Sequence, residues 1–325
     1  MAKPLLFIMT YTIIPPEYMK KFTDRFEVKY AATPEEMEQA FKEPWIKDVQ
    51  AVFTMGSRGV RRDVMDRMPK LEVACCKGAG YDGFDVAEMN KRNIAISHGS
   101  SINATFVADH SIALMLATVR NIVNFDAAVR RGDWVKGRSL PPSITGKKLG
   151  LIGMGEIGSK VAERCHRGFE MEVSYHTRNQ KAELPYRYFP KVIDLAKHVD
   201  FLMCILPLND QSRHIVNAEV LQALGPQGYL INMARGPVVS NAALIPALQQ
   251  NKIAGAGLDV VEGEPNIPAE LIALKNVTMT PHVGGHVPES AAQTLDLLLA
   301  NLDAHFAGKP MVTPIPGSTG RKRAA

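Results

Sequence analysis

The sequence has 325 residues, 46% of them hydrophobic and 22% charged, with a formal net charge of +5. It is long enough for two domains, and its composition is ordinary for a soluble globular protein. Basic residues are not interleaved with aromatic ones, and the most apolar helical stretch, residues 112–119, is short. We therefore expect no nucleic-acid partner and no membrane partner.

The four cysteines are not spaced as a CxxC motif, and Cys75-Cys76 lies in an apolar run that predicts a buried strand. Reduced core thiols are therefore favoured over a metal or redox role, and we expect no metal site. The first residues carry no signal pattern. These features predict a cytoplasmic enzyme.

Short apolar runs alternate with helical spacing through the first hundred residues. Strands are expected at 5–9, 27–30, 49–55, 71–76 and 94–97. Helices are expected at 16–26, 34–42, 61–68 and 84–93. This alternation predicts a parallel sheet with helices on both faces.

One long helix is expected over residues 103–131, followed by a second alternating unit. Its six strands are expected at 148–152, 172–175, 201–206, 229–232, 254–258 and 277–280. A last helix, at 289–306, cannot complete this sheet, so we expect it to return to the first domain. The chain would then cross between the domains near His98 and His286.

The predicted fold class is α/β, with two doubly wound parallel-sheet domains. Residues 1–98, completed by 287–325, would form a flavodoxin-like substrate domain. Residues 99–286 would form a Rossmann dinucleotide-binding domain. Because such folds bind ligands at the carboxyl ends of their strands, we expect the active site in a cleft between the two sheets.

A glycine-rich loop, Gly153-Met154-Gly155-Glu156-Ile157-Gly158, lies between an expected strand and an expected helix. Gly153 would permit a tight turn, Gly155 a close approach of a pyrophosphate, and Gly158 close packing of helix on strand. The helix N-terminus would add N–H donors and a favourable dipole. A glycine-rich turn alone is a weak signal, but this context favours nucleotide binding.

After the next strand the sequence reads His176-Thr177-Arg178-Asn179, where NAD-preferring sites usually place an acid. A guanidinium there can bind a 2′-phosphate with two hydrogen bonds, and no carboxylate repels it. We therefore predict NADP as the cofactor, with NADPH preferred over NADH. The alternative is that Arg178 is a solvated surface residue.

Three side chains then follow expected strands in chain order: Arg235, Glu264 and His282. An Arg at the carboxyl end of a strand, beside a bound nicotinamide, can bind a substrate carboxylate and its neighbouring carbonyl. Reduction of a ketone by hydride creates an alkoxide, which a histidine backed by a carboxylate can protonate. Taken singly, a loop glutamate and a core or capping histidine are the simpler interpretations. Their combination favours catalysis.

The chain resembles the D-isomer-specific 2-hydroxyacid dehydrogenase family over nearly its whole length. The carrying segments are Gly78-Ala79-Gly80-Tyr81-Asp82, Val107-Ala108-Asp109-His110, Gly153 to Gly158, Leu206-Pro207-Leu208, Ala234-Arg235-Gly236, Gly257-Leu258-Asp259-Val260, Glu264-Pro265 and Thr280-Pro281-His282. The basic turn at Thr177-Arg178 and the ending Gly308-Lys309-Pro310 look most like those of the NADPH-dependent glyoxylate, hydroxypyruvate and hydroxyphenylpyruvate reductases.

The resemblance implies that Arg235, Glu264 and His282 are catalytic and that the N–H groups of Ala79 and Gly80 hold the substrate carboxylate. Other candidate substrate contacts are Ser57, Arg58 and His286, although Arg58 could be solvated and His286 could instead cap the returning helix. Besides the glycine loop and the basic turn, the expected cofactor contacts are Leu206, Pro207, Ser212, Met233, Ala234, Asp259, His282 and Gly284. A homodimer formed through the 103–131 helix is also implied.

Together these features predict an NADPH-dependent reductase that converts a small 2-keto acid to the D-2-hydroxy acid, with His282 as the general acid/base. One alternative is a dinucleotide-sensing interaction protein on the same fold. Another is an NAD-dependent D-2-hydroxyacid dehydrogenase of different specificity. The sequence does not separate glyoxylate, hydroxypyruvate and aryl-pyruvate substrates.

Overall fold

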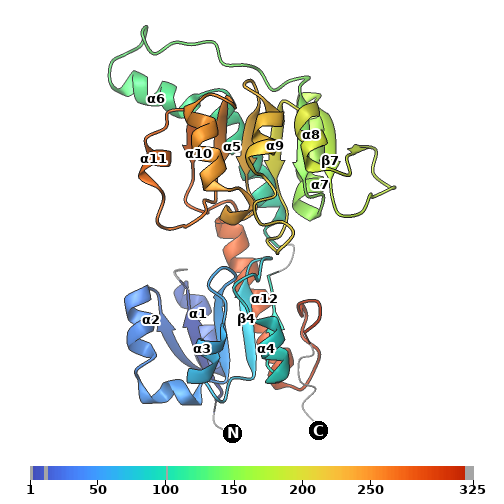
Figure 1. Cartoon of the computed structure of the whole chain (residues 1–325). Helices are drawn as coiled ribbons and strands as arrows, with labels where there is room; N and C mark the ends of the chain where they lie inside the picture. Colours follow the sequence, from blue (N-terminus) through green and yellow to red (C-terminus); the bar gives the residue numbers. More distant parts are fainter. Residues whose placement is uncertain (1–2, 11–13, 100–101, 319–325) are drawn as a thin grey trace. The chain divides into compact units, whose positions relative to one another are not determined.

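The computed structural model describes residues 3–10, 14–99 and 102–318 (Figure 1). Internal contacts divide the chain into two compact units, one made of Met1–Asn103 with Val287–Ala325 and the other of Ala104–His286. The sequence predicts the first boundary at residue 98, whereas the first unit runs on to Asn103.

The described residues of the first unit form five strands and five α-helices. Its strands are β1 (Leu5–Met9), β2 (Glu27–Ala31), β3 (Ala51–Met55), β4 (Val73–Lys77) and β5 (Ala95–Ser97). Its helices are α1 (Pro16–Arg25), α2 (Pro34–Ala40), α3 (Arg62–Arg67), α4 (Val86–Lys91) and α12 (Pro288–Phe306), with a 3-10 turn, η1 (Pro44–Asp48).

The five strands pair in parallel in the order β2-β1-β3-β4-β5, which is the flavodoxin-like order. Successive side chains of β1 point to opposite faces, so Phe7 joins one core layer and Ile8 the other. The Phe7 layer includes Met65 of α3, whereas the Ile8 layer includes Leu298 of α12. The last helix therefore completes the first unit.

The second unit holds seven strands. They are β6 (Lys148–Ile152), β7 (Glu172–His176), β8 (Arg187–Tyr188), β9 (Phe201–Cys204), β10 (Tyr229–Asn232), β11 (Gly255–Leu258) and β12 (Val277–Met279). Its helices are α5 (Ala104–Val119), α6 (Ile122–Arg130), α7 (Glu156–Phe169), α8 (Val192–His198), α9 (Ala218–Leu224), α10 (Asn241–Gln249) and α11 (Ala269–Ile272), with a 3-10 turn, η2 (Gly236–Val238).

This sheet is parallel, in the order β12-β11-β10-β9-β6-β7-β8. The order reverses between β6 and β9, as in a Rossmann fold, so the predicted fold class is confirmed. The expected six strands were one too few. The missed strand is β8, whose two residues pair with Ser174 and Tyr175 of β7. A strand so short has too few residues to show an alternating pattern.

The single helix expected over residues 103–131 is wrong. The chain turns by 60° between α5 and α6, where Asn121 adopts a left-handed conformation with φ of 55°. Asparagine tolerates this conformation better than most residues, and no apolar periodicity marks such a break. Among the described residues no single helix is long and apolar enough to cross a bilayer, although α5 and α6 taken together pass on length and composition.

Candidate active site

The predicted site residues of the second unit follow six of its parallel strands. The glycine loop follows β6, the basic turn follows β7 and Leu206 follows β9. Arg235 follows β10, Glu264 lies in the loop after β11, and His282 follows β12. Because the carboxyl ends of parallel strands share one edge, the fold gathers these loops at that edge.

The glycine loop has the geometry that a dinucleotide phosphate requires. Gly153 has φ of 108°, and a Cβ there would lie 2.0 Å from the Ile205 carbonyl oxygen. A Cβ on Gly158 would lie 2.5 Å from the Gly153 oxygen, so helix and strand pack closely. At Gly155, by contrast, a Cβ would meet nothing within 4 Å. Open space thus lies beside the N-cap of α7, whose first N–H groups receive no side-chain cap.

The basic turn after β7 is held by its own neighbours. Tyr188 Oη donates to the Thr177 carbonyl at 3.2 Å, and Thr177 Oγ1 donates to the Asn179 carbonyl at 2.6 Å. His176 Nδ1 lies 3.0 Å from the Phe189 carbonyl. Arg178 is exposed, so its guanidinium is accessible to a phosphate.

His282 and Glu264 form a direct pair, with Nδ1 and Oε1 2.7 Å apart. Since the carboxylate accepts, Nδ1 carries the hydrogen, and Nε2 is left to exchange a proton with a ligand. The other carboxylate oxygen of Glu264 accepts from the Val261 N–H at 3.3 Å. The His282 backbone is left-handed, with φ of 54°, and its N–H donates to the Asp259 carbonyl at 2.8 Å.

Asp259 is buried and stabilises the turn that carries His282. Its carboxylate accepts from the N–H groups of Val283 and Gly284 and from Thr280 Oγ1, at 2.9, 3.0 and 2.6 Å. His110 Nε2 lies 3.1 Å from Thr280 Oγ1 and 3.5 Å from Asp259 Oδ1. The sequence assigned no role to His110 or Thr280. Their place in the family-like segments was the only available signal.

The loop that carries Arg235 packs against the loop that carries Glu264. A Cβ on Gly236 would lie 2.3 Å from the Val261 carbonyl, so only glycine fits there. Buried Asn232 fixes the turn by donating to the Arg235 carbonyl at 3.1 Å. Arg235 is half-buried, and its Nη1 donates to the Ala234 carbonyl at 2.8 Å. These contacts place the Arg235 loop beside the loop that carries Glu264.

The loop after β9 contains Leu206-Pro207, and Ser212 stabilises it. Ser212 Oγ donates to the Pro207 carbonyl at 2.8 Å and accepts from the Asn209 N–H at 2.7 Å. Because both bonds are internal, Ser212 shapes this loop. Of the remaining expected cofactor contacts, Met233 and Ala234 are buried directly after β10.

A second histidine–carboxylate pair lies outside the predicted site. His214 Nε2 is 2.6 Å from Glu262 Oε1, and His214 is exposed. Partial burial acts to raise the pKa of Glu262, but hydrogen bonds from His214 and from the Asn241 N–H lower it below its ordinary value. Like His282, His214 has a left-handed backbone, with φ of 53°.

In the first unit, the loop after β4 is held through its carbonyl groups. The Gly99 N–H donates to the Gly78 oxygen at 2.7 Å, and the Cys76 thiol donates to the Gly80 oxygen at 3.1 Å. Gly56 of the preceding loop must be glycine, because a Cβ there would lie 1.7 Å from the Gly80 oxygen. Within the described ranges, the N–H groups of Ala79 and Gly80 donate no backbone hydrogen bond. Adjacent N–H groups of this kind are the donors that an anion-binding loop requires, so residues 78–80 are called the predicted anion-binding loop.

The other predicted substrate contacts are Ser57, Arg58 and His286, and they differ in exposure. Ser57 is exposed beside Gly56. Arg58 is half-buried, and its Nη1 contacts the Met37 sulfur. His286 is exposed and is not the N-cap of α12, which is Val287.

The four cysteines are all buried and free. Burial raises the pKa of Cys75, Cys165 and Cys204 to about 12. Such thiols do not form the thiolate needed for metal binding or redox chemistry near neutral pH. Among the described residues, no group of three or more His, Cys, Asp or Glu side chains could hold a metal ion.

A Rossmann sheet that brings a glycine loop, an arginine and a carboxylate-held histidine to one edge defines a class, the dinucleotide-dependent oxidoreductases. Residues 112–284 match the family model described as "D-isomer specific 2-hydroxyacid dehydrogenase, NAD binding domain". The chain belongs to the D-isomer specific 2-hydroxyacid dehydrogenase family. It is therefore an enzyme that acts on the CH–OH group of 2-hydroxy acids or on the corresponding keto group.

Curated relatives include a hydroxyphenylpyruvate reductase of Plectranthus scutellarioides, 39% identical over 83% of this chain and 86% of that protein. A glyoxylate reductase of Pyrococcus furiosus is 35% identical over 94% of both chains. Among solved structures, an NADPH-dependent glyoxylate/hydroxypyruvate reductase of Sinorhizobium meliloti, in complex with NADP and malonate, is 35% identical. It matches with a TM-score of 0.91 over 100% of both chains.

Gly155→Ala separates cofactor binding from folding. A Cβ at Gly155 meets no protein atom within 4 Å, so we expect an unchanged thermal midpoint. The same methyl would fill the space beside the α7 N-terminus, and we expect NADPH affinity to fall about 10-fold or more from lost hydrogen bonds to charged phosphate. Isothermal titration calorimetry and thermal unfolding measure the two effects.

Gly168→Ala is the matched control, because Gly168 lies on the same helix and its Cβ would also meet nothing. It should leave NADPH affinity unchanged. Equal affinities in the wild type and in Gly155→Ala would show that the pyrophosphate does not lie at this loop.

Proposed function

We propose that this enzyme reduces a small 2-keto acid to the D-2-hydroxy acid with NADPH. The observation that carries the proposal is the His282–Glu264 pair at 2.7 Å, in which Glu264 lies on the loop that packs against the Arg235 loop. The relatives at 35–39% identity named above are reductases of this kind. We assign substrate binding to the first unit, Met1–Asn103 with Val287–Ala325, and dinucleotide binding to the second, Ala104–His286.

In this proposal, two guanidinium N–H groups of Arg235 bind the substrate carboxylate and its neighbouring carbonyl oxygen. The N–H groups of Ala79 and Gly80 bind the carboxylate. When bound, the reduced nicotinamide supplies a hydride to the carbonyl carbon. His282 Nε2 gives its proton to the developing alkoxide, and Glu264 stabilises the imidazole through Nδ1. In the oxidation direction His282 accepts the proton.

The proposed preference for NADPH rests on the turn at His176–Arg178, which holds no carboxylate and presents an exposed guanidinium. An NAD-specific site would need an acid to hold the ribose hydroxyls. The open space at Gly155 and the uncapped N-terminus of α7 fit the pyrophosphate. A dinucleotide-sensing role without catalysis is not favoured, because it does not require the His282–Glu264 pair.

A panel of 2-keto acids assayed with NADPH and NADH tests this function. We expect glyoxylate, hydroxypyruvate or an aryl-pyruvate to be reduced faster with NADPH. Arg178→Ala should then lower kcat/KM for NADPH about 10- to 100-fold and leave that for NADH nearly unchanged, since hydrogen bonds to charged groups contribute roughly 1.5–3 kcal/mol.

Arg167→Ala is the control, because Arg167 is an exposed arginine on α7 that pairs with Glu163. It should leave both cofactors unaffected. Equal efficiency with NADPH and NADH in the wild type would favour an NAD-dependent dehydrogenase of another specificity.

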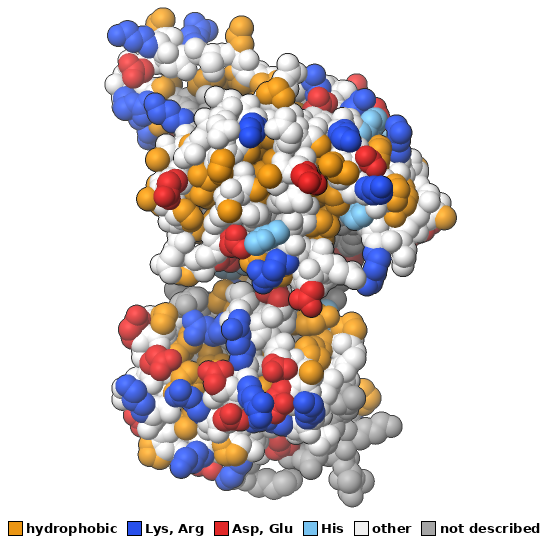
Figure 2. All heavy atoms as spheres, viewed as in Figure 1, with side chains coloured by type: hydrophobic (Ala, Val, Ile, Leu, Met, Phe, Trp, Pro, Cys, Tyr) orange, Lys and Arg blue, Asp and Glu red, His pale blue; other side chains and the backbone are white. Residues whose placement is uncertain are grey.

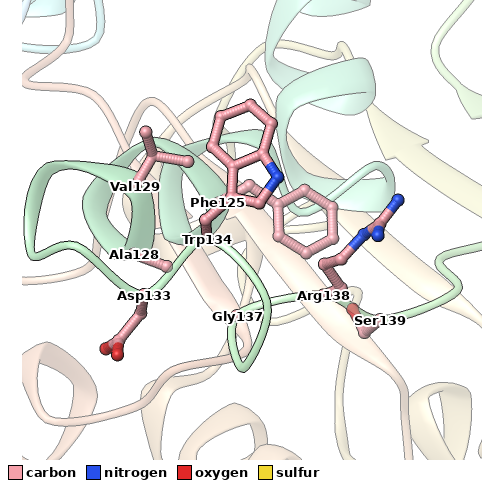
Figure 3. A pocket seen from close by; sticks show the side chains of 8 residues that line it. All are labelled: Phe125, Ala128, Val129, Asp133, Trp134, Gly137, Arg138 and Ser139. Carbon is pink, nitrogen blue, oxygen red and sulfur yellow. The ribbon is translucent and has the colours of Figure 1, made fainter.

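We further propose that the enzyme is a homodimer formed through α6 and the segment after it. Exposed apolar side chains concentrate there, including Trp134 at 69%, Val135 at 74% and Leu140 at 101% exposure. In Figure 2, basic side chains gather next to apolar ones over the place where Figure 1 shows α6. A hollow of about 270 Å³ lies against α6 (Figure 3), lined by Phe125, Ala128, Val129, Asp133, Trp134, Gly137, Arg138 and Ser139. An exposed apolar surface of this kind is typical of a subunit interface.

Val135→Asp tests the dimer, because a carboxylate at an apolar interface is left unpaired. Light scattering after gel filtration should give twice the chain mass of 35.6 kDa for the wild type and a single chain mass for the variant. Ile272→Asp, at an apolar position 60% exposed on α11, should remain a dimer. A monomeric wild type would refute the proposal.

We also propose a cytoplasmic location. The four cysteines are free and buried, and unpaired thiols are typical of reducing compartments.

A further inference from the structure

His98 lies against a carbonyl of the predicted anion-binding loop in the first unit. Its Nδ1 is 3.2 Å from the Ala79 oxygen. Its ring meets the Tyr81 ring edge to face, with the centroids 5.7 Å apart. A carbonyl oxygen only accepts, so Nδ1 carries the hydrogen and donates it to Ala79. No role assigned above uses this histidine.

The Ala79 carbonyl and the Gly80 N–H belong to the same peptide group. In a trans peptide these two groups point in opposite directions. A donor that holds the carbonyl on one side therefore orients the N–H toward the other side. The hydrogen bond also polarises the amide, which makes its N–H a stronger donor. Through one contact, His98 both orients and strengthens the Gly80 N–H.

The neighbouring carbonyls are held in the same manner. The Gly78 oxygen accepts from the Gly99 N–H, and the Gly80 oxygen accepts from the Cys76 thiol. Three consecutive carbonyls of the loop thus have donors. Of the three donors, only His98, which donates to the Ala79 carbonyl, is an imidazole. It can be replaced without altering the backbone or β4.

His98 is itself fixed by the carboxyl-terminal segment. Its N–H donates to the Thr313 carbonyl at 3.0 Å, and its carbonyl accepts from Thr313 Oγ1 at 2.7 Å. Thr313 in turn donates its N–H to Oδ1 of buried Asn301 on α12, at 3.0 Å. These bonds set the position from which the imidazole reaches Ala79.

We propose that His98 is a positioning residue for the substrate carboxylate. It orients and polarises the Ala79–Gly80 peptide so that the Gly80 N–H binds the carboxylate of the keto acid. This inference rests on the proposed function, because it requires that the loop binds a 2-keto acid.

His98→Leu and His98→Asn form the test pair. Leucine has a similar branched shape and no donor. In asparagine, Nδ2 is separated from the backbone by as many bonds as Nδ1 of histidine, so it can donate to Ala79 from the same place. We expect His98→Leu to raise KM for the keto acid about tenfold, as for one hydrogen bond acting on a charged group. His98→Asn should restore most of the affinity, while kcat and the Kd of NADPH stay near wild-type values in both variants.

Rescue by asparagine distinguishes this role from a structural one, because a packing role would depend on the ring. If KM in folded His98→Leu stays within about twofold of wild type, or if His98→Asn is no better than His98→Leu, the inference is overturned. Should His98→Leu fail to fold, His98→Ala gives the same comparison. A wild type that reduces no 2-keto acid would refute the proposed function, whereas an active wild type with an unaffected His98→Leu would refute only this inference.

Discussion

His282→Asn should abolish most turnover while leaving NADPH binding intact. Asparagine tolerates the left-handed backbone at this position, where φ is 54°. Its Nδ2 can still donate to Glu264, in place of the Nδ1 that lies 2.7 Å from Oε1. What it lacks is an Nε2 that can give a proton to an alkoxide. We therefore expect kcat to fall about 10²- to 10⁴-fold, the usual contribution of general acid–base catalysis.

Steady-state assays and NADPH titration measure the two effects of His282→Asn. His214→Asn is the matched control, because His214 also has a left-handed backbone and also pairs with a glutamate. It should keep kcat within about threefold of wild type, since surface pairs contribute little. Near wild-type rates in His282→Asn would show that another group protonates the product.

Arg235→Lys should lower kcat/KM for the keto acid about 10²- to 10³-fold, as expected from losing one or two hydrogen bonds to charged groups and their fork geometry. The charge is retained, so the effect isolates the two-pronged contact of the guanidinium. Because the Arg235 backbone is held by Asn232, at 3.1 Å from the carbonyl, the loop should keep its conformation. Stopped-flow and steady-state reduction of the keto acid at saturating NADPH check this result.

Arg167→Lys is the control for charge-conserving substitution, because Arg167 pairs with Glu163 on the exposed face of α7. It should be indistinguishable from wild type. If kcat/KM of Arg235→Lys stays within about threefold of the wild-type value, the bidentate contact of the guanidinium plays no part in the reaction.

Much of the site was predictable because its signals are local. Gly153 and Gly158 make close backbone contacts that only glycine permits. The spacing of glycines in a loop between a strand and a helix indicates such contacts. Glu264 and His282 each follow an apolar strand, so their common edge follows from parallel pairing.

Other features depend on contacts between residues far apart in the chain. His98 contacts Ala79 and Thr313, and His110 contacts Thr280, across separations that no local pattern reports. The break at Asn121 was missed because apolar residues continue on both sides of it. The N-cap of α12 is Val287 and the helix begins at Pro288, a boundary that sequence patterns fix only to within one or two residues.

By itself, the sequence determined the fold class, the order of every strand except β8 along the chain, and the chemistry of the proposed catalytic side chains. Periodicity and strand-end motifs are encoded over a few neighbouring residues. Only the tertiary structure decided how those side chains are held. The Nδ1 hydrogen of His282, the buried hydrogen bonds of Asp259 and the donors to the loop at Ala79 all arise when separate loops pack together.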